Sequence, residues 1–366
     1  MFKGLTRALR FGTAWKAETP KVLESELKIG YPDGTFPATL LLPEGTSGPL
    51  PGWVTLHGIT RSGRKHPTLV RFVRALAASG AAVLVPEVPE WREMYLAPSE
   101  ASKTLHAAIL ALADRKETQP GRIGAMGFSF GAPQALLAGT DPTLIPHLRC
   151  VVSFGGYFDL ERTVRFLFTG EHEWQGNVHR VEPDPYGRWI VGGNFLTRTE
   201  EYRDTGEVEG ALLDLARSAG DIQVPSWDPI HDTLKLELEG ALPEEHRELF
   251  RAFAPNAGVA LDSSREEPLV RALAEAARGV SPLFDIGPCL KDIRVPVRLI
   301  HGRQDRLIPF TETLRLAERF PANSDVRVFL TGLFSHSQRD PDNPPANAIG
   351  EQLGFLRLMS VILGDM

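Results

Sequence analysis

The chain has 366 residues, of which 42% are hydrophobic and 23% charged, and its net charge is −6. This balance argues against a dedicated binder of nucleic acid or of anionic membranes. Its two cysteines, Cys150 and Cys289, form no CxxC pair, which disfavours a disulfide framework and fits a reducing compartment. No apolar run approaches the roughly 18 to 20 residues of a membrane span, so we expect a cytoplasmic protein.

Residues 1–21 are basic before the first acid, Glu18, and lack the continuous apolar core of a secretory signal. A transit peptide is one interpretation. A short amphipathic helix that packs on the domain is the simpler one.

Between residues 22 and 159, short apolar segments alternate with segments of helical periodicity. Residues 22–31 and 35–43 flank the turn signal PDG and predict an antiparallel hairpin. Four further strands are expected, at residues 52–58, 80–88, 122–129 and 150–156. Helices are expected among them, at residues 66–80 and 99–115. The alternation predicts a mostly parallel central sheet flanked by helices.

Residues 160–284 interrupt this alternation. Apolar side chains within 206–220 follow helical spacing, and those within 266–279 repeat it. Pro243 begins a third helical segment, at a position where a first turn tolerates proline. Because we find no convincing buried strand here, we expect a helical cap inserted into the sheet domain.

The alternating pattern resumes in residues 285–366. Strands are expected at residues 295–302 and 325–332, and a closing helix at 346–363. The predicted organisation is an N-terminal segment (1–21), a core domain (22–159 and 285–366) and an insertion (160–284).

The segment GAMGFSFGA, residues 124–132, places Ser129 between Gly127 and Gly131 where an expected strand meets an expected helix. This GxSxG pattern is typical of a strained turn that projects the serine hydroxyl toward a helix N-terminus. The glycines leave room for the neighbouring backbone. A tight glycine turn with a solvated serine is the alternative, but the strand and helix context favours a nucleophile.

A serine nucleophile requires a base and a group that orients the base. Asp305 follows the strand expected at 295–302, and His336 follows the next one, so both belong to the carboxyl edge of the sheet. A turn aspartate and a surface-loop histidine are the alternatives for these two residues. Asp340 and Asp342 are the next candidates for the acid.

The loop LHGITRSG, residues 56–63, follows the strand expected at 52–58. Its His57–Gly58 pair lets the backbone approach an acyl oxygen. The amides of Ile59 and Phe130 are the predicted oxyanion donors. A plain strand-to-helix connection is the alternative.

The motifs LHG, GFSFGA, HGRQDRLIP and SHS occur in this order. They resemble those of α/β-hydrolase superfamily serine hydrolases, in the esterase, lipase and prolyl-oligopeptidase-like range. The resemblance covers roughly residues 22–156 and 286–366. It implies an α/β-hydrolase fold in which Ser129 is the nucleophile, His336 the base and Asp305 the orienting acid. Ala132 stands where many peptidase-like members have a further glycine, which disfavours a peptidase.

Four further side chains are candidates for substrate contacts. Arg61 and Arg64 lie beside the expected oxyanion loop and can hold a carboxylate or phosphate, although a solvated loop is the simpler interpretation. Trp189 and Phe195 can line an acyl pocket or form the core of the insertion. The insertion's histidines lack zinc spacing, and the sequence contains no phosphate-binding glycine motif, so we expect neither a metal nor a cofactor.

We therefore expect a serine hydrolase that cleaves a small-molecule carboxylic ester through a Ser-His-Asp triad and an acyl-enzyme. We expect no nucleic-acid partner and no membrane span. An acyltransferase or a C–C or amide hydrolase with the same triad is an alternative, as is a non-catalytic binding protein on a hydrolase scaffold. The sequence leaves the oligomeric state open.

Overall fold

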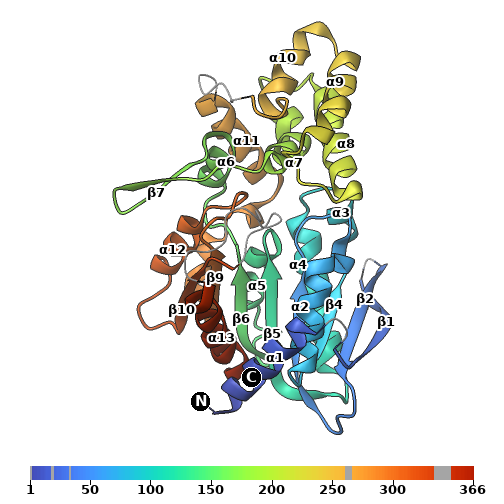
Figure 1. Ribbon diagram of the computed structural model, residues 1–366, viewed down its shortest axis with the longest axis vertical. Helices are drawn as coiled ribbons and strands as arrows, with labels where there is room; N and C mark the ends of the chain where they lie inside the picture. Colours follow the sequence, from blue (N-terminus) through green and yellow to red (C-terminus); the bar gives the residue numbers. More distant parts are fainter. Residues whose placement is uncertain (1, 18–19, 33, 260–265, 334–347) are drawn as a thin grey trace.

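The computed structural model describes residues 2–17, 20–32, 34–259, 266–333 and 348–366. Its centre is an eight-stranded sheet in the order β1-β2-β4-β3-β5-β6-β9-β10 (Figure 1). The strands span Val22–Tyr31 (β1), Gly34–Pro43 (β2), Leu50–Leu56 (β3), Ala82–Pro86 (β4), Thr118–Phe128 (β5), Leu148–Phe154 (β6), Val297–Gly302 (β9) and Val326–Thr331 (β10). β2 pairs antiparallel with β1 and β4, and the pairs from β4 to β10 are parallel. The predicted mostly parallel sheet is confirmed.

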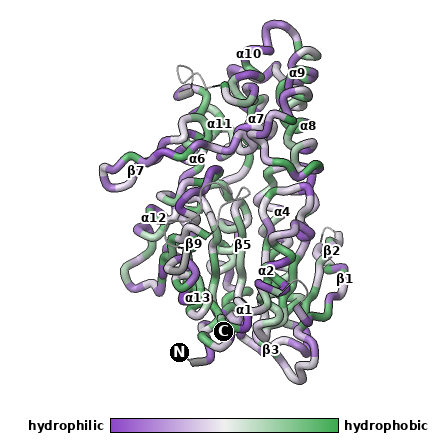
Figure 2. Tube along the Cα trace, in the orientation of Figure 1, coloured by the Kyte–Doolittle hydropathy of each residue, from purple (hydrophilic) through white to green (hydrophobic). Residues whose placement is uncertain are grey.

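Helices cover both faces of the sheet because consecutive strand residues point to opposite sides. Trp53 and Met126 belong to a buried cluster that includes α1 (Phe2–Lys16), α2 (Pro67–Ala78) and α13 (Ala348–Gly364). Their neighbours Val54 and Ala125 belong to a second cluster, on the other face. That face is covered by α4 (Pro98–Ala113), α5 (Gly131–Ala138) and α12 (Phe310–Glu318). Figure 2 shows the hydrophobic segments gathered in these layers.

The polypeptide between β6 and β9 forms the insertion, which lies beyond one end of the sheet (Figure 1). Its helices span Leu160–Thr169 (α6), Pro185–Phe195 (α7), Gly206–Ile222 (α8), Asp232–Ala241 (α9), Glu244–Phe253 (α10) and Glu266–Val280 (α11). A short helix of the core, α3 (Pro89–Arg92), lies near α8. Short 3₁₀-helices span Gly63–Lys65, Leu196–Arg198, Pro229–His231, Pro282–Phe284 and Gly287–Asp292.

The insertion also contains a two-stranded hairpin that the sequence analysis did not predict. Its strands are β7 (Glu171–Trp174) and β8 (Asn177–Arg180). The hairpin projects from the molecule and is largely hydrophilic (Figures 1 and 2). Of the eight strand residues only His172 is buried, so the segment carries almost none of the apolar alternation by which a half-buried strand is recognised.

Within the described residues, no helix combines the length and apolar character that crossing a membrane requires.

Candidate active site

Ser129 follows β5 in a backbone conformation that side chains rarely adopt. Its φ angle is +53°, in the left-handed region. Its amide donates a hydrogen bond to Phe154 O (2.8 Å), and its carbonyl oxygen accepts one from Ala132 N (2.9 Å) at the start of α5. Such strain persists only where the surroundings impose it, and it concentrates at functional sites. The strained strand-to-helix turn predicted from GxSxG is therefore present.

Three glycines make this turn possible. A Cβ atom on Gly127 would overlap the carbonyl oxygen of Gly131, and one on Gly131 would lie 2.6 Å from His57 O. A Cβ on Gly58 would lie 3.1 Å from Ser129 Cβ. The backbone of the loop after β3 thus packs directly against the serine, at a distance that only glycine permits.

The loop after β3 holds the peptide between Gly58 and Ile59 in one orientation. His57 Nδ1 lies 2.6 Å from Gly58 O, and because a carbonyl oxygen only accepts hydrogen bonds, Nδ1 carries the proton. In a trans peptide the N–H points opposite to the C=O, so the amide of Ile59 faces away from this imidazole. His57 Nε2 lies 3.0 Å from a carboxylate oxygen of Glu87, and both side chains are buried.

Glu87 was not predicted from the sequence, although an acid within the apolar run AAVLVPEV indicates a buried carboxylate. A buried carboxylate needs partners, and here it accepts a hydrogen bond from the amide of Arg64 (3.2 Å) and lies 3.8 Å from Nε of the same residue.

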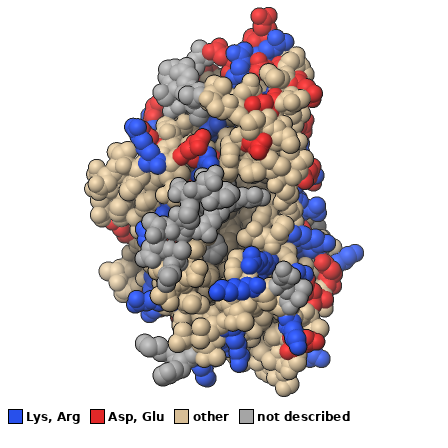
Figure 3. Space-filling view, viewed as in Figure 1, with Lys and Arg blue, Asp and Glu red and all other residues tan. Residues whose placement is uncertain are grey.

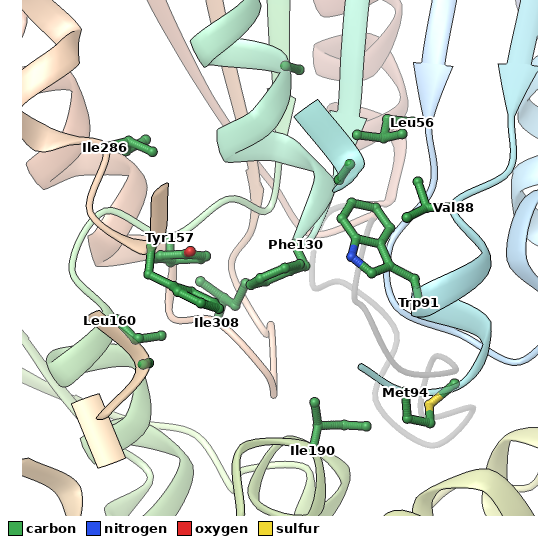
Figure 4. Packing of buried hydrophobic residues seen from close by; sticks show 14 of the residues in the cluster. Leu56, Val88, Trp91, Met94, Phe130, Tyr157, Leu160, Ile190, Ile286 and Ile308 are labelled. Atoms are coloured by element: carbon green, nitrogen blue, oxygen red, sulfur yellow. The ribbon is translucent and has the colours of Figure 1, made fainter. Parts of the chain in front are cut away.

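The predicted second oxyanion donor, Phe130, is held through its ring. The ring lies 5.6 Å from Trp91, 6.1 Å from Tyr157 and 5.7 Å from Phe284, measured between centroids. Figure 4 shows Phe130 between Trp91 and Tyr157. Within the described part of the chain, neither the amide of Phe130 nor that of Ile59 donates a hydrogen bond to a protein acceptor. Both amides are thus available to a ligand.

Asp305 lies in the loop after β9 with 3% of its surface exposed. Its Oδ1 accepts hydrogen bonds from the amides of Leu307 (2.9 Å) and Ile308 (3.0 Å). Its Oδ2 lies 3.4 Å from Nε2 of His301, which also bonds Ile308 O (2.9 Å). The carboxylate is therefore held in one orientation by its own turn and by a buried imidazole.

His336, the predicted base, lies outside the described residues, as do Asp340 and Asp342. Their part in the site stays a prediction.

A cavity of about 520 Å³ contains Ser129 and brings the separate candidates together. Asp305, Ile59, His57 and Gly58 line it as well. The insertion contributes several segments to the same wall: Asp184, Tyr186, Ala219, Gly220, Gln223, Val224, Pro225 and Ser226. The cavity therefore lies where the carboxyl ends of the strands meet the insertion, as expected for open α/β sheets.

The chain matches no family model, and no curated protein matches its sequence. Solved structures match its fold. Brefeldin A esterase, a bacterial homologue of human hormone sensitive lipase, gives a TM-score of 0.50 at 15% identity, over 98% of this chain and 84% of its own. Est1E from Butyrivibrio proteoclasticus gives 0.50 at 10% identity, over 93% and 98%. The acylaminoacyl peptidase of Pyrococcus horikoshii gives 0.50 at 14% identity, over 96% and 42%.

The chain has the α/β-hydrolase fold.

In this α/β-hydrolase fold, Arg61 and Arg64 are engaged by carboxylates of the protein. Arg61 bonds Asp221 of α8 and Glu93 of the core, each at 2.9 Å, and so ties the insertion to the sheet domain. Arg64 is 7% exposed and pairs with Glu26 at 2.7 Å. These ion pairs support a structural role for both arginines rather than the substrate contact considered from the sequence.

Trp189 and Phe195 lie in the core of the insertion. Trp189 is fully buried and packs edge-to-face on His231 (6.0 Å between centroids), beneath the ammonium group of Lys235. Phe195 is 2% exposed and packs against Phe284. Neither is among the described residues that line the cavity, so the pocket wall assigned to them from the sequence is formed instead by other insertion residues.

The cavity contains few charges. Burial lowers the pKa of His66, and the neighbouring His57 lowers it further. Burial raises the pKa of Tyr186. Both side chains therefore stay neutral near pH 7. No lysine or arginine is found among the described lining residues. Asp184 accepts hydrogen bonds from Tyr186 N and Ser226 Oγ. Figure 3 shows the Lys, Arg, Asp and Glu side chains on one face of the molecule.

Proposed function

We propose that the protein is a serine hydrolase that cleaves carboxylic esters of uncharged acids. One observation carries this proposal. Ser129 occupies a left-handed, strand-to-helix turn at the wall of a cavity that is also lined by Ile59 and by the buried, oriented carboxylate of Asp305, and among the described residues the amides of Ile59 and Phe130 have no protein acceptor. This combination is what covalent acyl transfer requires.

In the proposed mechanism, Ser129 Oγ attacks the acyl carbon while His336 takes the hydroxyl proton. The amides of Ile59 and Phe130 hold the oxyanion of the tetrahedral intermediate. His336 then gives its proton to the leaving alcohol, which departs as the acyl-enzyme forms. Water, deprotonated by His336, releases the acid and restores Ser129. Asp305 orients His336 and stabilises its cation throughout.

The insertion acts as a cap in this proposal. Its segments around Tyr186 and Val224 line the cavity opposite Ser129, so a bound ester would be enclosed between core and cap. Enclosure excludes bulk water and strengthens the interactions that hold the oxyanion. The described lining residues include no lysine or arginine that could pair with an anionic acyl group, which supports esters of uncharged acids as the substrate class.

Ser129→Ala tests the nucleophile. We expect the variant to keep its thermal melt and to lose fluorophosphonate labelling and nearly all hydrolysis of p-nitrophenyl butyrate, because no other group can form the acyl-enzyme. Asp305→Asn is the companion variant, with kcat lower by roughly 10⁴-fold. Labelling of Ser129→Ala at the wild-type rate would refute the assignment and direct attention to Ser226, the other serine among the described lining residues.

A further inference from the structure

The residue after Asp305 joins the acid-bearing turn to the insertion. Arg306 O accepts a hydrogen bond from Asp184 N (2.7 Å), and Arg306 Nε donates one to Glu182 O (2.9 Å). The guanidinium also pairs with the Glu182 carboxylate at 2.9 Å and lies over the ring of Trp227, 4.0 Å from its centroid. These contacts reach two separate segments of the insertion, at residues 182–184 and at 227.

The same turn fixes the carboxylate of Asp305. Oδ1 is bound by the amides of Leu307 and Ile308, the two residues that follow Arg306. The carbonyl oxygen of Arg306 and the amide of Leu307 belong to one planar peptide, so a movement of that peptide moves the Leu307 donor directly. The orientation of the carboxylate is therefore coupled to how the insertion sits on the core.

We propose that Arg306 is a positioning residue for Asp305. Through Arg306, the orientation of the Asp305 carboxylate depends on how the insertion packs against the core domain. This inference rests on the proposed role of Asp305 in the triad. Arg306 lies outside the described cavity wall, although its neighbours Asp305 and Leu307 belong to it. Its effect would pass through the carboxylate, so it would change turnover rather than substrate binding.

The chain contains a matched control. Arg315, on α12, also joins the core domain to the insertion through its guanidinium. This group donates a hydrogen bond to Glu173 O (2.7 Å) and pairs with the Glu173 carboxylate (3.0 Å). It also lies over the ring of Trp174, 5.6 Å from the ring centroid. Its partners belong to the hairpin β7–β8, whose residues do not line the cavity. Arg306 and Arg315 thus make the same kinds of contact with the insertion. They differ in that the partners of Arg315 lie in the hairpin, away from the cavity wall.

The experiment compares Arg306→Gln with Arg315→Gln on p-nitrophenyl butyrate. We expect Arg306→Gln to lower kcat about tenfold with KM changed by less than about twofold, since small misplacements of a catalytic group are costly. Arg315→Gln should leave both constants within about twofold, at a similar loss of thermal stability. Equal kinetic effects of the two substitutions would overturn the proposal. Should Arg306→Gln fail to fold, Trp227→Leu removes the stacking partner alone and is expected to lower kcat in the same way.

A double-mutant cycle separates positioning from a general structural effect. In an Asp305→Asn background, Arg306→Gln should change kcat by less than about twofold. The reason is that Arg306 is proposed to act through the Asp305 carboxylate, which this background lacks. A full tenfold effect in that background would overturn the proposal while leaving the triad intact. Wild-type activity of Asp305→Asn alone would instead refute the proposed function, so the two failures are distinguishable.

Discussion

Arg61 and Arg64 are paired with carboxylates of the protein and do not line the described cavity wall. The guanidinium of Arg61 is shared between two carboxylates, and that of Arg64 is buried against Glu26. The acidic side chains among the described lining residues are Asp184 and Asp305, and no lysine or arginine accompanies them there. At the scale of single residues, this wall supports the proposal that the substrate's acyl group carries no negative charge.

We predict that neutral esters are much better substrates than anionic ones of equal length. Moving a carboxylate against a wall whose described residues include no lysine or arginine leaves it desolvated and unpaired, which costs several kcal/mol. The measurement is kcat/KM for a butyrate ester against a hemisuccinate ester of the same alcohol, and we expect a ratio of about 100 or more. Comparable values for the two would show that a cation reaches the acyl group.

At the scale of elements, the connection from β5 to α5 is the most constrained part of the fold. The carbonyl oxygen of Gly131 occupies the space that a Cβ on Gly127 would need. Because the obstacle is backbone, it cannot be moved by a change of rotamer. The sequence pattern and the local geometry agree here. Gly127 and Gly131, which allow the turn, are also the glycines on either side of Ser129.

Gly127→Ala should lower the free energy of unfolding by about 3 kcal/mol or more, through this overlap. Gly210→Ala is the control: this glycine lies within α8 and a Cβ there would meet nothing within 4 Å. The control substitution should stabilise the protein by about 0.5 to 1 kcal/mol, because alanine favours a helix over glycine. Chemical denaturation of both variants measures the difference, and a stable Gly127→Ala would contradict the geometry.

At the scale of the whole molecule, the insertion and the sheet domain share one apolar core. Phe130 and Trp91 from the core domain and Ile190 of α7 belong to one buried cluster, part of which Figure 4 shows. Arg61 and Arg306 add polar contacts between the two parts. The insertion therefore has two kinds of residue: those that support it and those that face the cavity.

Substitutions in these two groups should have different effects. Trp189→Ala should destabilise the protein by about 3 to 5 kcal/mol, because it empties a buried site. Val224→Ala, at the cavity wall, should leave stability within about 1 kcal/mol and shift the relative kcat/KM of hexanoyl and acetyl esters by roughly tenfold. Thermal melts and an acyl-length series distinguish the two. A Val224→Ala variant that changes every ester by the same factor would show that this wall does not select the acyl group.

The sequence by itself determined the layered sheet and the turn at Ser129, because both follow from local signals. Alternating apolar periods define strands and helices. The glycines at 127 and 131 specify a turn that few other residues allow. The position of Asp305 after a strand could likewise be predicted, and its place in the triad stays a proposal.

Only the tertiary structure decided which side chains meet across long separations. The carboxylate partners of Arg61 come from α8 and from the loop after α3, and no sequence period links them to it. Trp189 and Tyr186 lie three residues apart on α7, yet one is core and the other wall, because the helix packs between its neighbours and the cavity. Burial depends on what an element faces in space, and that is fixed only once the insertion has folded onto the sheet.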